Sequence, residues 1–535
     1  METPSAQLPA DLATCHQLIR DLLEKQSQDQ FLIDKLQHQL EQMLRHRFGQ
    51  RAERIDLNQL ELFVRELLRL PPDQPLEQVG ESTGRREKKD KKHTPHGRRP
   101  LPAHLPRERV EHDVPSAERG CQKCGLERQR ISEETSEQLE YQPASLKVLV
   151  QVRFKYACLN PECEGSVITA DKPWQPIEKG LPGPGLLSHV VVSKYADHLP
   201  LNRQEGILAR QGVELSRSTL CGWSMSAADL LRPLYELMWA EVRQSKVVPT
   251  DDTTVPVQDR ERTKTKTGRL WTCLGDRGHP YTVFAYTPDR SRNGPAEFLR
   301  GYSGYLQADA YAGYNVLYDT GRVIWVGCNA HARRKFVEAQ TSDPARALTA
   351  LAVYRQLYEV ERQARERGLD AQGRYELRLE KAKPLWEAFE KWLKKSALEA
   401  LPKSPIGEAL GYLLGNWEGL TRYLEDGDLE IDNNASERAL RLIVVGRKNW
   451  LFAGSDRGGR AAAILFSFTA TCKRHGIDPF EYLRDIFARI AGHPAHRLAE
   501  LLPDRWLAAK KAVVPAVADG SPERCSSPTG AVCRG

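Results

Sequence analysis

The sequence has no run of hydrophobic residues long enough to cross a membrane. A membrane-spanning helix needs roughly 20 consecutive apolar residues, whereas this 535-residue chain has a mean hydropathy of −0.55. The N-terminal segment also lacks the apolar core of a secretory signal peptide. These absences argue against a membrane protein or a secreted one and predict a soluble, cytoplasmic protein.

Cysteine is too sparse and too irregular for a disulfide framework. The chain has 11 cysteines, an odd number, so reduced thiols, some of them binding a metal, fit better. Two close pairs stand out, Cys121 with Cys124 and Cys158 with Cys163, and strand-like sequence separates them. Four thiolates in such pairs suit tetrahedral structural zinc, with unliganded buried cysteines as the alternative. We therefore expect a zinc-binding module over residues 116–175.

Positive charge exceeds negative charge only slightly, with 78 Lys and Arg against 71 Asp and Glu, and the excess is unevenly placed. Much of it lies in residues 85–99, which also have few apolar side chains. Such a segment does not bury enough surface to fold, so residues 71–115 are predicted to be a flexible linker. Basic linkers bind phosphate backbones without reading base sequence, although a solvated tether has the same composition.

The first 70 residues are predicted to be helical and to form a coiled coil. Apolar side chains occupy six of eight heptad positions with 3,4 spacing. A coiled coil would make the protein a homo-oligomer. One seam position is the charged Asp29, so the alternative is a helix that packs its apolar stripe on its own chain. The eight positions are Ile19, Leu22, Gln26, Asp29, Ile33, Leu36, Leu40 and Met43.

Residues 202–223 have the pattern of two helices joined by a glycine turn, within a helical region expected over residues 180–240. Gly212 marks the turn, and Ser216 is a typical N-cap for the second helix. The first turn of that helix would meet base edges in a DNA major groove, as a recognition helix does. An ordinary helical hairpin gives the same pattern. The residues predicted to contact DNA here are Arg217, Ser218 and Thr219.

Three acidic residues, far apart in the chain, each lie in a distinctive local pattern. Asp251 is near the middle of a β-branched run that predicts a strand. Asp309 ends a short apolar strand and is followed by small, turn-compatible residues. Glu437 follows a run of Asp and Asn residues that is typical of a helix start. Two strand carboxylates and one helix carboxylate are the arrangement of a ribonuclease-H-like core.

The chemistry of magnesium explains why these residue types would converge. Mg²⁺ prefers hard oxygen ligands, and two such ions about 4 Å apart stabilise both oxygens of a phosphoryl displacement. The acids therefore predict a two-metal nucleotidyl-transfer site. Taken singly, Asp251 and Asp309 are also ordinary strand-end or turn residues, and Glu437 is also half of a capping box with Asn434. Asp252 is an alternative ligand to its neighbour, but strand alternation lets only one of the two serve.

The remaining pattern predicts a multidomain α/β protein. Strands are expected at residues 269–274, 281–286 and 323–327, and a helix at residues 295–299. A strongly helical stretch then separates Asp309 from Glu437. The predicted order is residues 245–341 for the first part of the catalytic core, 342–430 for an all-α insertion, 431–515 for the final helices and 516–535 for a disordered tail.

Several basic residues lie close to the acids in the sequence. Those expected to bind phosphate are Arg333, Arg334, Lys335, Arg438, Arg441, Arg447 and Lys448. The alternative is that they cover a solvated helix face. Cys328 and His331 form a CxxH pair, but two ligands are too few for a zinc site. We therefore expect these two side chains to pack or hydrogen-bond beside the strand of Asp309.

Several long motifs, in one order along the chain, resemble those of the IS-sixty-six insertion-sequence family of DDE transposases. The resemblance spans nearly the whole chain, from Arg47 to about Pro479. It implies that Asp251, Asp309 and Glu437 are the catalytic triad, that a zinc-binding module is present, and that the element encodes two small accessory proteins. The motifs are Asp251-Asp252-Thr253, Leu306-Gln-Ala-Asp309-Ala-Tyr311, Cys328-Asn-Ala-His331-Ala-Arg-Arg-Lys335-Phe336, Asp432-Asn-Asn-Ala-Ser-Glu437-Arg438 and Gly446-Arg-Lys-Asn-Trp450-Leu-Phe-Ala-Gly454-Ser455.

The resemblance predicts the large transposase protein of such an element, associated with DNA in the nucleoid. With two Mg²⁺ or Mn²⁺ ions, a water would attack the phosphodiester at an element end, and the released 3′ hydroxyl would then attack target DNA. Terminal inverted repeats and target DNA would be the ligands. Two alternatives are a ribonuclease-H-like nuclease or resolvase without strand transfer, and a non-catalytic zinc-containing DNA-binding protein. The last leaves the three acidic motifs unexplained.

Overall fold

The computed structural model describes residues 16–17, 20–26, 29, 146–151, 155–156, 168–169, 174–178, 180–259, 261 and 263–513. The basic linker, most of the heptad helix and the C-terminal tail lie outside these residues. So do the predicted zinc ligands, Cys121, Cys124, Cys158 and Cys163. Within the described ranges, no helix is both long enough and apolar enough to cross a membrane.

The chain divides into two compact units, residues 75–171 and the remainder. In the smaller unit, strand β1 (Lys155–Tyr156) pairs antiparallel with β2 (Ile168–Thr169). The three predicted catalytic acids all belong to the larger unit.

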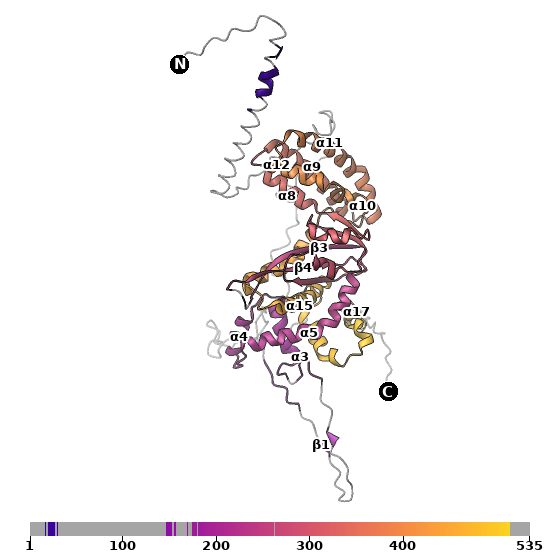
Figure 1. The fold of residues 1–535 in the computed structure, drawn as a ribbon. Helices are drawn as coiled ribbons and strands as arrows, with labels where there is room; N and C mark the ends of the chain where they lie inside the picture. The colour runs from indigo at the N-terminus through magenta and orange to yellow at the C-terminus, as the bar shows by residue number, and fades with distance from the viewer. Residues whose placement is uncertain are drawn as a thin grey trace, which may run out of the picture. The chain divides into compact units, whose positions relative to one another are not determined.

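A five-stranded mixed sheet forms the core of the larger unit (Figure 1). Its spatial order is β5-β4-β3-β6-β7. Strands β3, β4 and β5 are antiparallel neighbours, whereas β3, β6 and β7 run parallel. Of the strand-like sequence between the two cysteine pairs, residues 146–151 form no strand. The five strands predicted over residues 245–341 are all present. Their bounds are Val247–Val257 for β3, Lys266–Leu274 for β4, Thr282–Thr287 for β5, Gly304–Ala308 for β6 and Val323–Gly327 for β7.

Strand β3 pairs on both sides and carries two acidic residues into the sheet. Asp251 lies opposite Thr272 of β4, and Asp252 lies opposite Trp271. The N-terminal end of β3 pairs instead with β6. Valine and threonine make up most of the strand, which is why its sequence favours extended backbone. Since side chains alternate between the faces of a strand, the two acids serve opposite sides of the sheet.

The outer edge of the sheet, at β5, is covered by helix α15 (Asp456–His475). The backbone N–H of Thr282 donates to the hydroxyl of Thr471 at 3.1 Å, and that of Phe284 donates to the hydroxyl of Ser467 at 2.8 Å. Buried backbone donors must find partners, and an edge strand leaves every second one unpaired. The hydroxyls of Thr471 and Ser467 therefore accept hydrogen bonds from edge amides that could otherwise pair with another strand.

The predicted helix, glycine turn and capped helix are present on the N-terminal side of the sheet. Gly212 in the turn has a φ of +81°, a conformation that glycine adopts without strain. The backbone N–H of Thr219 donates to the side chain of the N-cap Ser216 at 3.2 Å. The helices are α3 (Pro184–Tyr195), α4 (Leu201–Arg210) and α5 (Arg217–Val242).

The stretch between Asp309 and Glu437 is helical from α8 onward and packs around a second hydrophobic core, to which Val247 of β3 and Val326 of β7 also contribute. The rings of Tyr354, Trp386 and Phe389 meet there with centroids about 6 Å apart. Arg378 and Glu361 form a buried ion pair at 2.7 Å. The helices are α8 (Asn329–Ala339), α9 (Pro344–Glu366), α10 (Ala371–Leu377), α11 (Lys383–Glu399), α12 (Pro405–Gly415) and α13 (Trp417–Thr421).

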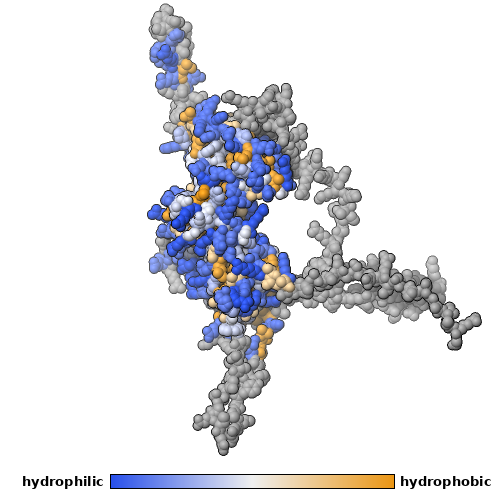
Figure 2. All heavy atoms as spheres, turned by 90° about the vertical axis from the view of Figure 1, so that its right-hand side faces the viewer, coloured by the Kyte–Doolittle hydropathy of each residue, from blue (hydrophilic) through white to orange (hydrophobic). Residues whose placement is uncertain are grey.

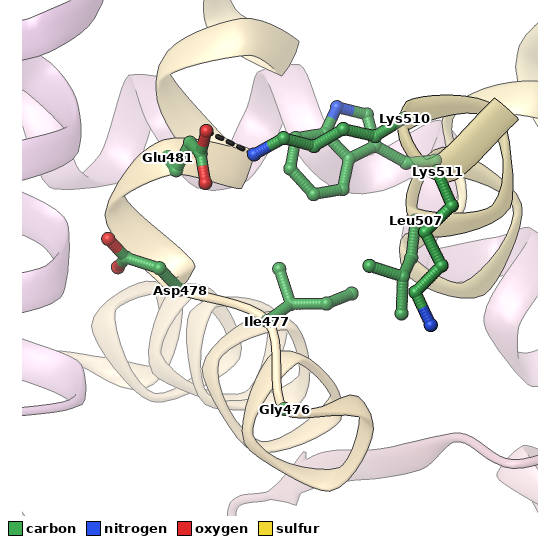
Figure 3. A pocket seen from close by; sticks show the side chains of 8 residues that line it. Gly476, Ile477, Asp478, Glu481, Leu507, Lys510 and Lys511 are labelled. Carbon is green, nitrogen blue, oxygen red and sulfur yellow. Dashed lines mark hydrogen bonds and ion pairs between the residues drawn. The ribbon is translucent and has the colours of Figure 1, made fainter. Parts of the chain in front are cut away.

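Helix α14 (Asn434–Trp450) returns the chain to the sheet, and α16 (Pro479–Arg489) and α17 (Pro503–Val513) follow α15. A cavity of about 500 Å³ lies between the end of α15, α16 and α17 (Figure 3). Lys510 crosses it, pairing with Glu481. No predicted catalytic acid lines this cavity, so it is separate from the candidate site.

Candidate active site

Asp251 enters the site from the middle of β3. Its Oδ1 accepts a 2.7 Å hydrogen bond from the backbone N–H of Asp252. Burial raises the pKa of Asp251 to about 7; the Asp252 amide opposes that rise, and the charges of Asp309, Asp252 and Glu437 add to it. The charges of two carboxylates from distant parts of the chain, Asp309 and Glu437, therefore act on Asp251.

Asp309 directly follows β6, as the apolar run ending in an acid predicts. Its Oδ1 accepts a 3.3 Å hydrogen bond from the backbone N–H of Tyr311. Its Oδ2 lies 3.7 Å from Nη2 of Arg290. Burial raises the pKa of Asp309, while the positive charges of Arg290 and His331 act in the opposite direction.

Glu437 lies in the first turn of α14 and is close to two basic residues of α8. Its Oε1 is 3.8 Å from Nε2 of His331 and 3.9 Å from Nη2 of Arg334. These separations are too long for hydrogen bonds. The carboxylate therefore sits in a positive environment without a short contact to either group.

The capping-box alternative for Glu437 does not match the structure. The N-cap of α14 is Asn433, and no side chain caps the helix. The Nδ2 of Asn434 donates instead to Oδ2 of Asp432 at 2.7 Å. Satisfying helix amides is thus not the reason for an acid at position 437.

Asn433 joins the elements that carry the acids, and sequence reasoning missed it. Its buried side chain donates from Nδ2 to the backbone carbonyl of Thr250 at 2.7 Å and accepts from the hydroxyl of Ser436 at 2.8 Å. Its backbone N–H lies 3.2 Å from Sγ of Cys328, the acceptor. Cys328 therefore hydrogen-bonds, as expected, whereas the buried Nδ1 of His331 finds no hydrogen-bond partner in the described part of the chain. The Asp-Asn-Asn run was the only signal, and it indicated no more than a helix start.

Asp252 is engaged on the other face of β3. Its side chain is only 3% exposed and lies 2.8 Å from Nη1 of Arg269 and 2.9 Å from Nη2 of Arg290. Charge-assisted contacts of this length are strong and directional. One buried carboxylate thus serves two arginines. Neither arginine was among the predicted site residues.

A cleft of about 430 Å³ opens beside Asp309. Cations and aromatic rings alternate in its wall: the guanidinium of Arg290 lies 4.2 Å from the ring centroid of Tyr311, and Nζ of Lys335 lies 5.1 Å from that of Tyr412. Such pairs attract through the quadrupole of the ring. Tyr412 comes from α12 of the helical stretch. The remaining lining residues are Asp309, Ala310, Ala312, His331, Arg334 and Glu338.

The three acids fit a hard divalent cation in kind, because all their donors are carboxylate oxygens. Burial and repulsion from the other acids raise the pKa of Asp251 to about 7, so the charged carboxylate is unfavourable there. A bound cation would stabilise the charged form. Within the described part of the chain, no group of three or more His, Cys, Asp or Glu side chains is close enough to hold a metal ion. Asp309 and Glu437 lie instead beside the basic side chains of Arg290 and His331.

The other basic residues predicted to bind DNA do not line the cleft. Arg447 is half-buried and donates from Nη1 to the hydroxyl of Thr254 in β3 at 2.9 Å. Hydrophilic residues dominate the face drawn in Figure 2, and hydrophobic residues form small separate groups there. Arg333 on α8 is exposed, as are Arg438, Arg441 and Lys448 on α14. At the start of α5, Arg217 and Ser218 are exposed and Thr219 is half-buried.

Comparison with protein families gives one consistent match along the chain. Residues 179–461 match the model described as "Transposase IS66 family". Residues 35–110 match "Transposase C of IS166 homeodomain", and residues 118–164 match "zinc-finger binding domain of transposase IS66". Residues 467–503 match "IS66 C-terminal element".

Three similar proteins come from Sinorhizobium fredii. "Uncharacterized protein y4hP" is 36% identical over 505 residues, which are 90% of each chain. "Uncharacterized protein y4qI" is 37% identical over 77% of this chain and 78% of its own length. "Uncharacterized protein y4jD" is 34% identical over 76% of this chain and 82% of its own.

Proposed function

Because this chain belongs to the IS66 family of transposases, we propose that it cuts DNA at the ends of its element and joins those ends to target DNA. Asp251, Asp309 and Glu437 are the residues that would hold the metal ions of this reaction. Two Mg²⁺ or Mn²⁺ ions, when bound, would stabilise the attacking and leaving oxygens of each phosphoryl displacement.

The observation that carries the proposal is the electrostatic convergence of the three acids. Burial together with the charges of Asp309 and Glu437 raises the pKa of Asp251 to about 7. The side chains of Asp309 and Glu437 are 26% and 35% exposed and lie near Arg290 and His331, yet the charges of both acids still raise the pKa of Asp251. A carboxyl whose pKa is raised by burial and by neighbouring acids is characteristic of functional sites. A site for divalent cations accounts for the acids better than any structural role.

Asp251, and not Asp252, is the acid of β3 that we assign to the metal site. Asp252 is already paired at short range with two arginines, whereas the Asp251 side chain accepts a hydrogen bond from the adjacent backbone. A ligand must have lone pairs available for the ion. The alternation of side chains along β3 keeps the two acids from sharing one site.

We further propose that the sheet is a ribonuclease-H-like core. The support is its topology, in which three antiparallel strands are followed by two that continue in parallel on the side of β3. Asp251 in the central strand, Asp309 at the end of its parallel neighbour and Glu437 on a helix beside β3 suit that architecture. The helices between Asp309 and Glu437 would then be an insertion into the core.

DNA would be held at several places along the chain. The cleft beside Asp309 offers Arg334 and Lys335 for phosphate and the ring of Tyr412 for a base. The start of α5 would contact the terminal inverted repeats, and the remaining exposed cations of α8 and α14 would add phosphate contacts. A zinc-binding module, homo-oligomers and two accessory proteins of the element complete the proposal.

The test is to incubate the purified protein and Mn²⁺ with DNA that spans the boundaries of its gene, and to map new 3′ hydroxyl ends and joined products. Ends at the inverted repeats, absent with Glu437→Gln, would support the assignment. Ends without any joined product would favour a nuclease or resolvase. Cleavage that persists in Glu437→Gln would remove Glu437 from the catalytic set.

A further inference from the structure

We propose that Arg290 is a phosphate-binding residue of the active site, preorganised by Asp252 to contact the phosphate that is cut. The inference rests on the proposed function, because it concerns the same reaction. It assigns a role to two residues that the acids alone leave unexplained.

Four contacts with Asp252 and Tyr311 fix the position of Arg290. Its Nε and Nη2 donate to Oδ1 of the buried Asp252, at 3.2 Å and 2.9 Å. Its guanidinium lies over the ring of Tyr311 at 4.2 Å, and the hydroxyl of Tyr311 donates to the backbone carbonyl of Arg290. An arginine held in this way loses little conformational freedom when it binds an anion.

The same side chain also reaches the cleft. Arg290 lines it, and its side chain remains 38% exposed. The hydrogen bonds from its guanidinium to Asp252 use Nε and Nη2 and do not involve Nη1. A guanidinium has five donors in a planar fork, so donors remain for a phosphate oxygen. The contacts with Asp252 and Tyr311 hold the guanidinium, and its exposed part is available to the substrate.

The local charges leave Arg290 able to bind a further anion. Asp252 is shared between Arg269 and Arg290, so the two arginines have one carboxylate at short range between them. The next acid, Asp309, lies 3.7 Å from Arg290, beyond hydrogen-bonding distance. Once the charge of Asp309 is taken up by a divalent cation, the excess positive charge of Arg290 would be balanced by a phosphate.

The arrangement also explains why an acid follows Asp251 in the sequence. Because side chains alternate along β3, Asp251 is on the side of the metal site and Asp252 is on the side of the arginine. Asp252 is accordingly a positioning residue, which acts through Arg290. Two adjacent acids would thus place the metal ions and the phosphate at a fixed separation.

The test measures binding, so that it does not depend on cleavage. Fluorescence anisotropy in Ca²⁺, which replaces Mg²⁺, would compare an end duplex with one whose cut phosphate is a neutral methylphosphonate. We expect the wild type to bind the neutral duplex about tenfold more weakly, the loss of one charge-assisted hydrogen bond. For Arg290→Gln we expect a clearly smaller difference between the two duplexes, because only the contact of the phosphate with the divalent ions would then remain. Arg290→Lys keeps a positive charge but lacks the planar fork of the guanidinium. Its discrimination between the duplexes should lie between those of the wild type and Arg290→Gln.

The matched control is Arg292→Gln, two residues along the same loop and not part of the cleft wall. It should discriminate between the duplexes as the wild type does. An Arg290→Gln protein that still discriminates tenfold would overturn the proposal, as would a wild type that does not discriminate. Thermal unfolding of each variant would show that Arg290→Gln is folded. Failure of the wild type to cleave in Mn²⁺ would count against the proposed function alone.

Discussion

The side-chain amide of Asn433 donates a 2.7 Å hydrogen bond to the backbone carbonyl of Thr250, the residue before Asp251. This contact joins the strand of Asp251 to the first turn of the helix that carries Glu437. Asn433 is 1% exposed, so both groups are shielded from water. One buried amide thus helps to set the relative position of two acids that are far apart in the sequence.

Asn433→Ala should therefore destabilise the fold and impair metal binding together. A buried carbonyl left without its donor costs about 1–3 kcal/mol. Denaturant unfolding would measure that loss, and calorimetric titration with Mn²⁺ would show weaker binding. The control is Asn434→Ala, because the Asn434 side chain bonds only locally, to Asp432. Unchanged Mn²⁺ affinity in Asn433→Ala would show that the hydrogen bond does not position the acids.

Asp251→Asn should stabilise the metal-free protein at alkaline pH. Burial raises the pKa of Asp251 to about 7, above its value near 4 in an unfolded chain. The folded state therefore holds this proton more tightly, and the charged carboxylate lowers stability progressively as pH rises from about 4 to 7. Asn removes that penalty.

In EDTA at pH 8, the gain in unfolding free energy would be on the order of 1–4 kcal/mol, and it would shrink as pH falls toward 4. Denaturant unfolding across this range measures it. Asp252→Asn should do the opposite, because Asp252 is buried between two arginines and breaking such a pair is destabilising. A constant gain for Asp251→Asn at every pH would contradict the pKa assignment.

Tyr412→Ala should weaken the binding of end DNA to the cleft. Tyr412 supplies an aromatic wall from α12 and packs under Lys335. Base stacking on an aromatic side chain contributes about 1–3 kcal/mol, so the affinity should fall roughly tenfold or more. Tyr412→Phe keeps the ring and should bind as the wild type does. Equal affinity for all three proteins, measured by anisotropy in Ca²⁺, would exclude the ring from DNA binding.

The purified protein should contain about one structural zinc ion per chain, bound by four thiolates. Residues 118–164 match the zinc-finger model, and that range includes Cys121, Cys124, Cys158 and Cys163. Elemental analysis should find the zinc lost in Cys158→Ser and kept in Cys221→Ser, which changes an exposed cysteine of α5. Zinc retained in full by Cys158→Ser would exclude that thiol as a ligand.

The elements that carry the acids could be predicted because their signals are local. A β-branched run around Asp251, an apolar run ending at Asp309 and an Asp-Asn start before Glu437 each depend on a few adjacent residues. The five strands and the helical stretch followed for the same reason. The long gap between Asp309 and Glu437 was explained correctly as helical sequence.

The contacts that assemble the site could not be predicted in this way. Asn433 meets Thr250, and Arg290 meets Asp252, only because strand pairing and helix packing bring distant residues together. Sequence reasoning interpreted Asn433 as part of a helix-start signal, and it did not predict the pairing of Arg290 with Asp252. Arg447 shows the converse: its charge suggested a phosphate contact, while in the structure it bonds β3 through Thr254.

The most direct test of the account is the thermal unfolding of metal-free protein titrated with Mn²⁺. Binding to the folded state alone should stabilise the wild type by about 2.7 kcal/mol at 100 times the dissociation constant. Asp251→Asn, Asp309→Asn and Glu437→Gln should lose most of this stabilisation, whereas Asp252→Asn should keep it. Equal stabilisation of the wild type and the three acid variants would contradict the claim that these acids form the metal site.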